Sequence, residues 1–303
     1  MGNKDQLVSV IIPSYNHQTY VLKAVESVLQ QDWPYIDLIV IDDGSTDKTP
    51  ELLTDLYKER GGFRLVLNSN KGLIKTLNEG LRLAKGDFFC LLASDDYLVP
   101  GSLSRRAVFL SDNPTCVGVF GDALRLQGDN LSDERVMNAK RRNLFQMGDP
   151  IPEFIKGINL PIHTLMVRTT IFRAIGGFDE RYRYCEDLDP QLRLYLAGPI
   201  KFIDAPVYVI RQHMTNTTRL NPHVARVDKI LLYRKYLEEI KQLIPYKRLV
   251  HHQLRRQYLL LGRYLSKADR PDTVEKDIFK GAWQYSWQDI RLLWYLVRAH
   301  LRE

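Results

Sequence analysis

The sequence has few cysteines and no long apolar run. Cys90, Cys116 and Cys185 are scattered and form no CxxC pair, which argues against a disulfide framework or a structural zinc site. No uninterrupted apolar stretch approaches the roughly 20 residues that span a bilayer. The polar start, Met-Gly-Asn-Lys-Asp-Gln, is not typical of a signal peptide. We therefore expect a protein of the reducing cytosol that is soluble or at most peripheral on a membrane.

Glycine-rich phosphate-binding motifs are also missing. GxGxxG does not follow the first expected strand, and GxxxxGK[ST] occurs nowhere in the chain. The sequence therefore lacks the main motif that would indicate a dehydrogenase or a P-loop nucleotidase. There is no internal repeat and no low-complexity segment, and 45% hydrophobic with 26% charged residues is typical of a folded globular protein.

The net positive charge of the chain comes entirely from its C-terminal part. From Ala225 onward there are 17 Lys and Arg against 9 Asp and Glu, a net charge of +8, within a total of +7. Such an asymmetry predicts an anionic partner for this part, either a membrane surface or a nucleic acid. No nucleic-acid recognition motif accompanies the charge, so we expect no nucleic-acid partner.

The first 125 residues alternate between strand-like and helix-like patterns. Short apolar, β-branched runs predict buried strands, and apolar residues at helical spacing predict the helices between them. Strands that alternate with helices imply right-handed crossovers, so the fold class is α/β with a mostly parallel sheet flanked by helices. The expected strands are 7–12, 36–41, 63–67 and 87–92, and the expected helices are 20–30, 51–59 and 73–84.

The remainder of the chain predicts a second half and a helical extension. Residues 125–160 are polar and predict a loop or lid, and Pro206 predicts an edge or bulge in an extended segment 200–210. We expect a strand at 163–167 and helices at 170–175 and 188–196. The predicted domains are 1–222, made of a nucleotide-binding half 1–125 and an acceptor half 126–222, and a basic helical C-terminal region 223–303.

Three of the expected strands end in polar side chains. The first ends in Pro13-Ser14-Tyr15-Asn16, the second in Asp42-Asp43 and the fourth in Ser94-Asp95-Asp96. Ligands of an open parallel sheet bind beyond these carboxyl ends, where four clustered carboxylates repel one another unless a cation joins them. Mg²⁺ or Mn²⁺ bridging a diphosphate meets this need. The alternative is that each pair is a solvated turn.

These motifs, with Ser27-Val-Leu-Gln30 and Ile41-Asp-Asp-Gly-Ser-Thr-Asp47, resemble glycosyltransferase family 2 over about residues 7–220. The resemblance implies the GT-A fold and inversion at the transferred sugar. It also implies that Asp43 binds the imide N–H of a uracil-type base, Asp96 is the principal metal ligand, and Asp95 contacts the ribose or the metal. The nucleotide pocket would further include Pro13, Ser14, Tyr15 near the base ring, Asn16, and Lys71 and Lys75 as phosphate partners. Many members carry an acidic residue where Ala93 stands.

The resemblance continues in the acceptor half. Gly176-Gly-Phe-Asp179 followed by Cys185-Glu-Asp-Leu-Asp189 is similar to the family pattern in which Asp187 is the catalytic base and Glu186 binds the acceptor. The alternative, compatible with the first, is that these two acidic residues begin a helix. The family usually carries an aromatic residue directly after this aspartate. Leu188 follows Asp187 here, so we expect the acceptor pocket to differ from that of other members. Val209–His213 resembles a strand end that returns an Arg and a His toward the diphosphate, with His213 as a metal or phosphate ligand. For His163 we expect a structural role.

The resulting hypothesis is an inverting hexosyltransferase. It would use a nucleoside diphosphate-sugar donor, favoured as UDP, and a glycan or lipid-linked acceptor in the synthesis of lipopolysaccharide or capsule. The alternatives are a nucleotidyltransferase and a non-catalytic nucleotide-sugar-binding protein. Aromatic residues mixed with basic residues near the C-terminus favour either contact with an anionic inner membrane surface or packing of a helical cap on the catalytic domain.

Overall fold

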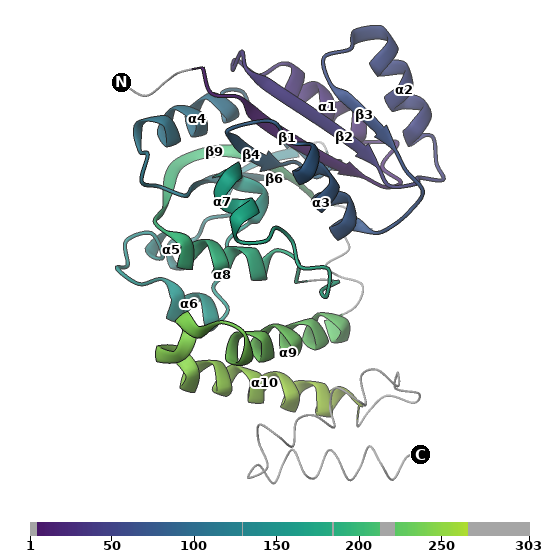
Figure 1. Ribbon diagram of the computed structural model, residues 1–303. Coiled ribbons are helices and arrows are strands. Elements are labelled where there is room, and N and C mark those ends of the chain that lie inside the picture. The colour runs from purple at the N-terminus through teal and green to yellow at the C-terminus, as the bar shows by residue number, and fades with distance from the viewer. Residues whose placement is uncertain (1–4, 129, 184, 213–221, 266–303) are drawn as a thin grey trace. The chain divides into compact units, whose positions relative to one another are not determined.

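A computed structural model describes residues 5–128, 130–183, 185–212 and 222–265 of the chain (Figure 1). By contacts the chain divides into two compact units, which are described separately. The first comprises Met1–Pro150, Asn159–Glu180 and Pro190–Met214, and the second comprises Ile151–Ile158, Arg181–Asp189 and Thr215–Glu303. The expected domain boundary after residue 222 stays a prediction.

The N-terminal half of the first unit is the predicted parallel α/β arrangement. Its strands lie in the order β3-β2-β1-β4, and all three pairings are parallel (Figure 1). The elements are β1 (Val8–Ser14), α1 (Val21–Leu29), β2 (Ile36–Asp42), α2 (Thr49–Arg60), β3 (Arg64–Leu67), α3 (Leu73–Leu83), β4 (Phe88–Leu91), β5 (Tyr97–Leu98) and α4 (Ser102–Asp112). The predicted α/β fold class is therefore confirmed.

The central strands are apolar on both faces because helices cover both. Val10 and Ile12 of β1 belong to a core with α1, α2 and α4, whereas Ile11 points to the other face, where Gly80 of α3 approaches it. A Cβ atom on Gly80 would lie 2.4 Å from Ile11 Cγ2, so only glycine permits this close packing. Burial on both faces explains the continuous apolar run from which this strand was predicted.

The second half of the first unit is a mixed sheet. Strand β8 (Leu165–Arg168) is antiparallel to β4 and β6 (Gly118–Gln127), and β9 (Ile200–Gln212) is parallel to β6 and antiparallel to β5. The predicted bulge at Pro206 is confirmed, since the β6–β9 register shifts around the pair Asp122 and Pro206. Two short helices, α7 (Thr169–Ala174) and α8 (Leu188–Ala197), agree with prediction, and a 3₁₀ turn, η1 (Ile162–Thr164), precedes β8.

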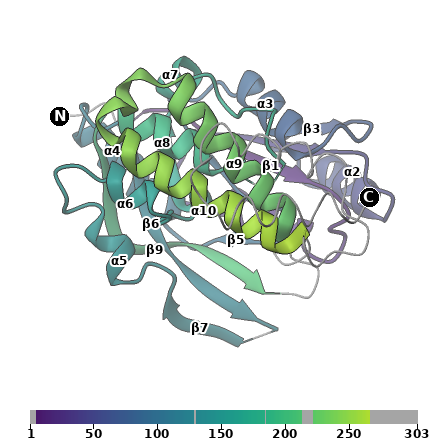
Figure 2. The same cartoon turned by 90° about the horizontal axis from the view of Figure 1, so that it is seen from below.

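The prediction of a loop or lid at 125–160 is wrong. Within it the chain completes β6, returns as the antiparallel strand β7 (Asn130–Arg135) (Figure 2), and forms α5 (Ala139–Asn143) and α6 (Ile151–Ile155). Ion pairs that form only in the folded protein explain the polar composition of this segment. Asp122 of β6 is fully buried and lies 3.2 Å from Arg142 and 3.6 Å from Arg135, so charged residues here neutralise one another inside the fold.

The second unit is helical, as predicted from residue 224 onward. Its main elements are α9 (Pro222–Glu238), the 3₁₀ turn η3 (Lys241–Tyr246) and α10 (Lys247–Leu265). Helices α9 and α10 pack side by side (Figures 1 and 2). Across the described ranges, no helix is both long enough and apolar enough to cross a membrane.

Candidate active site

The loops that follow β1 and β2 are joined by hydrogen bonds. The N–H of Asp43 donates to the Ser14 carbonyl at 2.8 Å, and the N–H of Asn16 donates to the Ser45 hydroxyl at 2.8 Å. Asn16 has a φ of 55°, a left-handed conformation that asparagine tolerates better than most residues. Its side-chain oxygen accepts from the N–H of Thr46 at 2.8 Å. The two predicted motifs therefore form one continuous rim.

Asp42 and Asp43 are buried and serve the loop itself. The Asp42 carboxylate accepts from the N–H and hydroxyl of Ser45, which closes a turn. The Asp43 carboxylate is 4% exposed and accepts from the N–H groups of Lys71 at 3.0 Å and Gly72 at 2.9 Å. Asp43 thereby ties the end of β2 to the segment ahead of α3. Because each carboxylate oxygen can accept more than one hydrogen bond, these bonds leave acceptor capacity for a nucleobase.

The other predicted nucleotide residues differ in exposure. Tyr15 is 46% exposed, which leaves much of its ring accessible for stacking, whereas the buried Ser14 hydroxyl has no hydrogen-bond partner. Pro13 is partly buried within β1. The ammonium of Lys71 contacts the carboxylate of Glu79, and Lys75 is exposed. A phosphate role for Lys71 would require it to leave Glu79.

The carboxylate of Asp96, 6% exposed, is held by two groups of β9. The backbone N–H of Arg211 donates to Oδ1 at 2.7 Å, and the Tyr208 hydroxyl hydrogen-bonds to the same carboxylate. That hydroxyl also accepts from the N–H of Ala93 at 2.9 Å. Burial, followed by the charge of Asp95, raises the pKa of Asp96 to about 7. A buried carboxylate beside a second one gains stability when a cation joins them.

The end of β4 contacts the β1 loop and β9. His17 Nδ1 lies 2.7 Å from the Ser94 hydroxyl, so the first and fourth strand ends meet, as their polar residues predicted. The Arg211 side chain donates from Nε to the Asp95 carbonyl at 3.0 Å and lies over the Tyr20 ring at 4.8 Å. Since Asp43 and Asp96 are both buried, they are not residues of solvated turns.

One residue of this site was missed, and another was expected only as the arginine of a returning strand end. Tyr208 stands in a predicted extended segment, and nothing in its local pattern indicates a hydrogen bond to a residue 112 positions away. For Arg211, the resemblance of Val209–His213 to a returning strand end was an available signal. His213 itself lies outside the described residues, so its predicted role stays untested.

His163 has the expected structural character. Its Nε2 atom is buried without a hydrogen-bond partner, its ring centroid lies 4.9 Å from that of Tyr208, and burial lowers its pKa to about 4. The imidazole is therefore neutral over the physiological range and packs as an apolar ring.

The second unit contains the predicted acceptor-side pair. Glu186 and Asp187 directly precede α8, and the backbone N–H groups of Asp187 and Leu188 act to lower the pKa of the Asp187 carboxyl. The interpretation that these two acidic residues lie at the start of a helix is thus confirmed. It is compatible with a catalytic role for the pair. Burial raises the pKa of Asp187 to about 6, and burial with the charge of Asp187 raises that of Glu186 to about 7. Glu186 Oε2 is buried without a hydrogen-bond partner.

The available metal donors are hard oxygens. Among the described residues, no group of three or more His, Cys, Asp or Glu side chains is arranged to hold a metal ion. Asp95 and Asp96 offer carboxylate oxygens of the kind that Mg²⁺ and Mn²⁺ accept, and both ions commonly complete their coordination with substrate phosphates and water. The destabilised charge on Asp96 fits such an ion.

A family model described as Glycosyl transferase family 2 matches residues 9–175. Chondroitin synthase from Escherichia coli is 29% identical over 225 residues, covering 70% of this chain and 30% of that protein. A Campylobacter jejuni GalNAc(5)-diNAcBac-PP-undecaprenol beta-1,3-glucosyltransferase is 36% identical over 129 residues, covering 42% of this chain and 41% of that protein. The matched region thus spans less than half of each of these two relatives.

Two solved structures share the fold. TarS 1–349 of S. aureus in complex with UDP-GlcNAc has a TM-score of 0.63 at 18% identity and covers 98% of this chain and 88% of that one. The mannosyltransferase PcManGT of Pyrobaculum calidifontis, in complex with GDP-Man and Mn²⁺, has a TM-score of 0.61 at 15% identity and covers 100% and 88%. The predicted GT-A fold is confirmed.

Proposed function

The chain belongs to glycosyl transferase family 2, and we propose that it transfers a sugar from a nucleoside diphosphate-sugar to an acceptor hydroxyl with inversion. The observation that carries this proposal is the buried Asp96, held by Tyr208 and Arg211 beside Asp95. It lies in the same unit as the joined β1 and β2 loops, and a His17–Ser94 contact connects the two regions. Nucleotides bind at this edge of α/β sheets.

We infer that Asp96, with Asp95, would hold Mn²⁺ or Mg²⁺ together with the donor diphosphate. The chemistry supplied by such an ion is neutralisation of the negative charge on the departing diphosphate. Arg211 and Tyr208 would keep the Asp96 carboxylate in one orientation. Support comes from the raised pKa of Asp96 and from the Mn²⁺ present in the structural relative PcManGT.

UDP is the favoured nucleotide. The exposed ring of Tyr15 would stack on the base, Pro13, Ser14 and Asn16 would shape the pocket, and Asp43 would accept the imide N–H. Lys71 and Lys75 remain the proposed phosphate partners. The UDP-GlcNAc bound in TarS supports this choice without defining the sugar for the present chain.

Asp187 would be the base. Its carboxylate would take the proton of the acceptor hydroxyl as the oxygen attacks the anomeric carbon from the face opposite the nucleotide, and Glu186 would orient that hydroxyl. A carboxylate with a pKa of about 6 is still ionised at neutral pH, yet more basic than an ordinary aspartate. Both conditions suit a general base.

A lipid-linked acceptor at the cytoplasmic face of a membrane is the finer proposal. The Campylobacter relative is named for an undecaprenol-linked glycan. Helix α10 carries Lys247, Arg248, Arg255, Arg256 and Arg263 and no Asp or Glu. A helix of this charge suits an anionic lipid surface. Flotation with liposomes containing anionic or only neutral lipid tests this, since Arg248→Glu with Arg256→Glu should abolish binding to anionic vesicles.

A donor screen tests the enzymatic proposal. The purified chain would be given UDP- and GDP-sugars with Mn²⁺ or EDTA, and release of nucleoside diphosphate would be measured. Asp96→Ala should abolish release, and Asp187→Asn should lower acceptor-dependent turnover by about 10²–10⁴-fold, whereas Asp55→Asn on exposed α2 should have no effect. Release of pyrophosphate from a nucleoside triphosphate and a sugar phosphate would instead indicate a nucleotidyltransferase. Binding without turnover of any donor would indicate a non-catalytic protein.

A further inference from the structure

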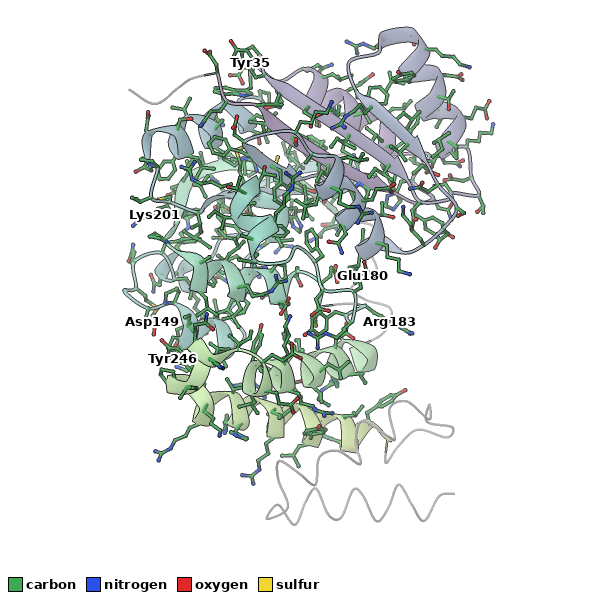
Figure 3. The ribbon with its side chains drawn as sticks, in the orientation of Figure 1. Tyr35, Asp149, Glu180, Arg183, Lys201 and Tyr246 are labelled. Carbon is green, nitrogen blue, oxygen red and sulfur yellow. The ribbon has the colours of Figure 1, made fainter. Side chains whose placement is uncertain are left out.

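The segment that carries Glu186 and Asp187 belongs to the same compact unit as the C-terminal helices. Residues 181–189 group with α6, α9 and α10. Helices α9 and α10 lie beyond residue 175, where the family match ends. Arg183, labelled in Figure 3, marks this segment. The role of α9 can therefore be examined from contacts inside one unit.

Asp228 of α9 makes the main contact with this segment. Its Oδ2 atom accepts from the backbone N–H of Arg183 at 2.6 Å and from that of Cys185 at 3.2 Å, and the residue is 2% exposed. One turn earlier on α9, the Ala225 carbonyl lies 3.7 Å from the Cys185 thiol. Two consecutive turns of α9 thus hold the residue directly ahead of Glu186.

A second contact holds the other side of the pair. Lys235, two turns after Asp228 on the same side of α9, places its ammonium 2.7 Å from the carboxylate of Asp189 in the first turn of α8. Lys235 is 9% exposed and Asp189 is fully buried. Buried, charge-assisted hydrogen bonds are directional and strong, so they restrict the backbone on both sides of Glu186 and Asp187.

We propose that Asp228 is a positioning residue, which fixes the backbone ahead of Glu186 and Asp187 so that both carboxylates are held in one orientation. This inference rests on the proposed role of Asp187 as base. It assigns the C-terminal helix α9 to the catalytic apparatus, whereas most of the net positive charge of the region lies on α10. Displacement of a catalytic group by about 1 Å can cost about 10²-fold in rate.

The charge of Asp228 supplies an independent readout. After burial and the charge of Asp187, Asp228 raises the pKa of Glu186, while Lys229 lowers that of Asp187. Because both backbone N–H groups donate to the single Oδ2 atom, the amide oxygen of Asp228→Asn can accept them without the charge. The Asn variant should therefore keep these two hydrogen bonds and lower the pKa of Glu186.

The experiment compares Asp228→Ala, Asp228→Asn and Glu239→Gln in the full chain. Glu239 is the matched control, since it bonds Arg181 of the same segment at 2.7 and 3.0 Å but is about half exposed. We expect Asp228→Ala to lower kcat about 10–100-fold with UDP affinity within about twofold of wild type. Asp228→Asn should keep kcat within about threefold and move the acid limb of kcat to lower pH. Glu239→Gln should match wild type.

A folded Asp228→Ala variant with normal kcat, or one that loses UDP affinity in parallel with kcat, would overturn the inference. If the Ala variant does not fold, an Asn variant with an unshifted acid limb overturns it and a shifted limb supports it. Amide hydrogen exchange of residues 181–189 reads the same contact without turnover, and should be faster in Asp228→Ala than in Glu239→Gln. Faster exchange in a protein that transfers no sugar would contradict the proposed function and leave the positioning role intact.

Discussion

Replacement of Tyr208 by phenylalanine removes one oxygen atom from the centre of the nucleotide-side site. The ring of this fully buried residue stays, so the change is confined to two hydrogen bonds. The N–H of Ala93 loses its acceptor at 2.9 Å, and the carboxylate of Asp96 loses a donor. An unsatisfied buried group costs about 1–3 kcal/mol, and a hydrogen bond to a charged group contributes about 1.5–3 kcal/mol.

With partial relaxation, we expect Tyr208→Phe to lower the free energy of unfolding by about 2–3 kcal/mol, which corresponds to roughly 4–12 °C in Tm for a unit of this size. Groups that orient a metal ligand typically contribute 10–100-fold to metal affinity, so the dissociation constant for Mn²⁺ should rise by about that factor. Calorimetry and electron paramagnetic resonance titration with Mn²⁺ measure the two effects separately.

Tyr236→Phe is the matched control. Tyr236 is 2% exposed and its hydroxyl has no hydrogen-bond partner, so the same chemical change should not lower Tm and should leave Mn²⁺ affinity nearly unchanged. The reasoning would be refuted by a Tyr208→Phe protein whose Tm and Mn²⁺ affinity equal those of Tyr236→Phe.

Three further predictions concern the proposed chemistry. Asp43→Asn leaves one of two buried backbone N–H groups without its carboxylate acceptor, so UDP affinity should fall about tenfold or more, and an unchanged calorimetric titration would contradict the role of Asp43. EDTA should abolish donor turnover and excess Mn²⁺ or Mg²⁺ should restore it, whereas turnover that is indifferent to EDTA would exclude a role for Asp96 as metal ligand. A general base acts only when ionised, and burial raises the pKa of Asp187 to about 6 and that of Glu186 to about 7. Turnover at saturating donor and Mn²⁺ should therefore be constant above pH 7 and fall toward tenfold per pH unit below 6, and a rate that stays constant down to pH 5 would rule out the pair.

Local sequence patterns were sufficient to predict the strands of the nucleotide-binding half. Apolar β-branched runs form strands when both faces are buried, so β1, β2 and β4 were predicted within one or two residues of their bounds. The polar residues after them were correctly expected to meet, because parallel strands place their carboxyl ends at one edge of a sheet. The His17–Ser94 contact and the bonds between the β1 and β2 loops confirm that expectation.

The second half of the first unit was harder to predict, because contacts between distant residues explain the composition of its strands. Strand β6 contains Gly118, Gly121 and the buried Asp122, none of which is typical of a central strand. A Cβ atom on Gly121 would lie 2.5 Å from Val207, so this glycine is required by the neighbouring strand, and Asp122 is stable only because Arg135 and Arg142 come back to it. Such compensation is invisible until the chain is folded.

The amino-acid sequence by itself determined the family motifs, the α/β order and the identity of the acidic residues, because each depends on neighbours in the chain. Only the tertiary structure decided what holds those residues. Tyr208 and Arg211 reach Asp96 from β9, and Asp228 reaches the segment of Glu186 from α9. Hydrogen bonds between residues more than 40 positions apart leave no periodic pattern, since the orientation of the partner is set by the packing of whole strands and helices.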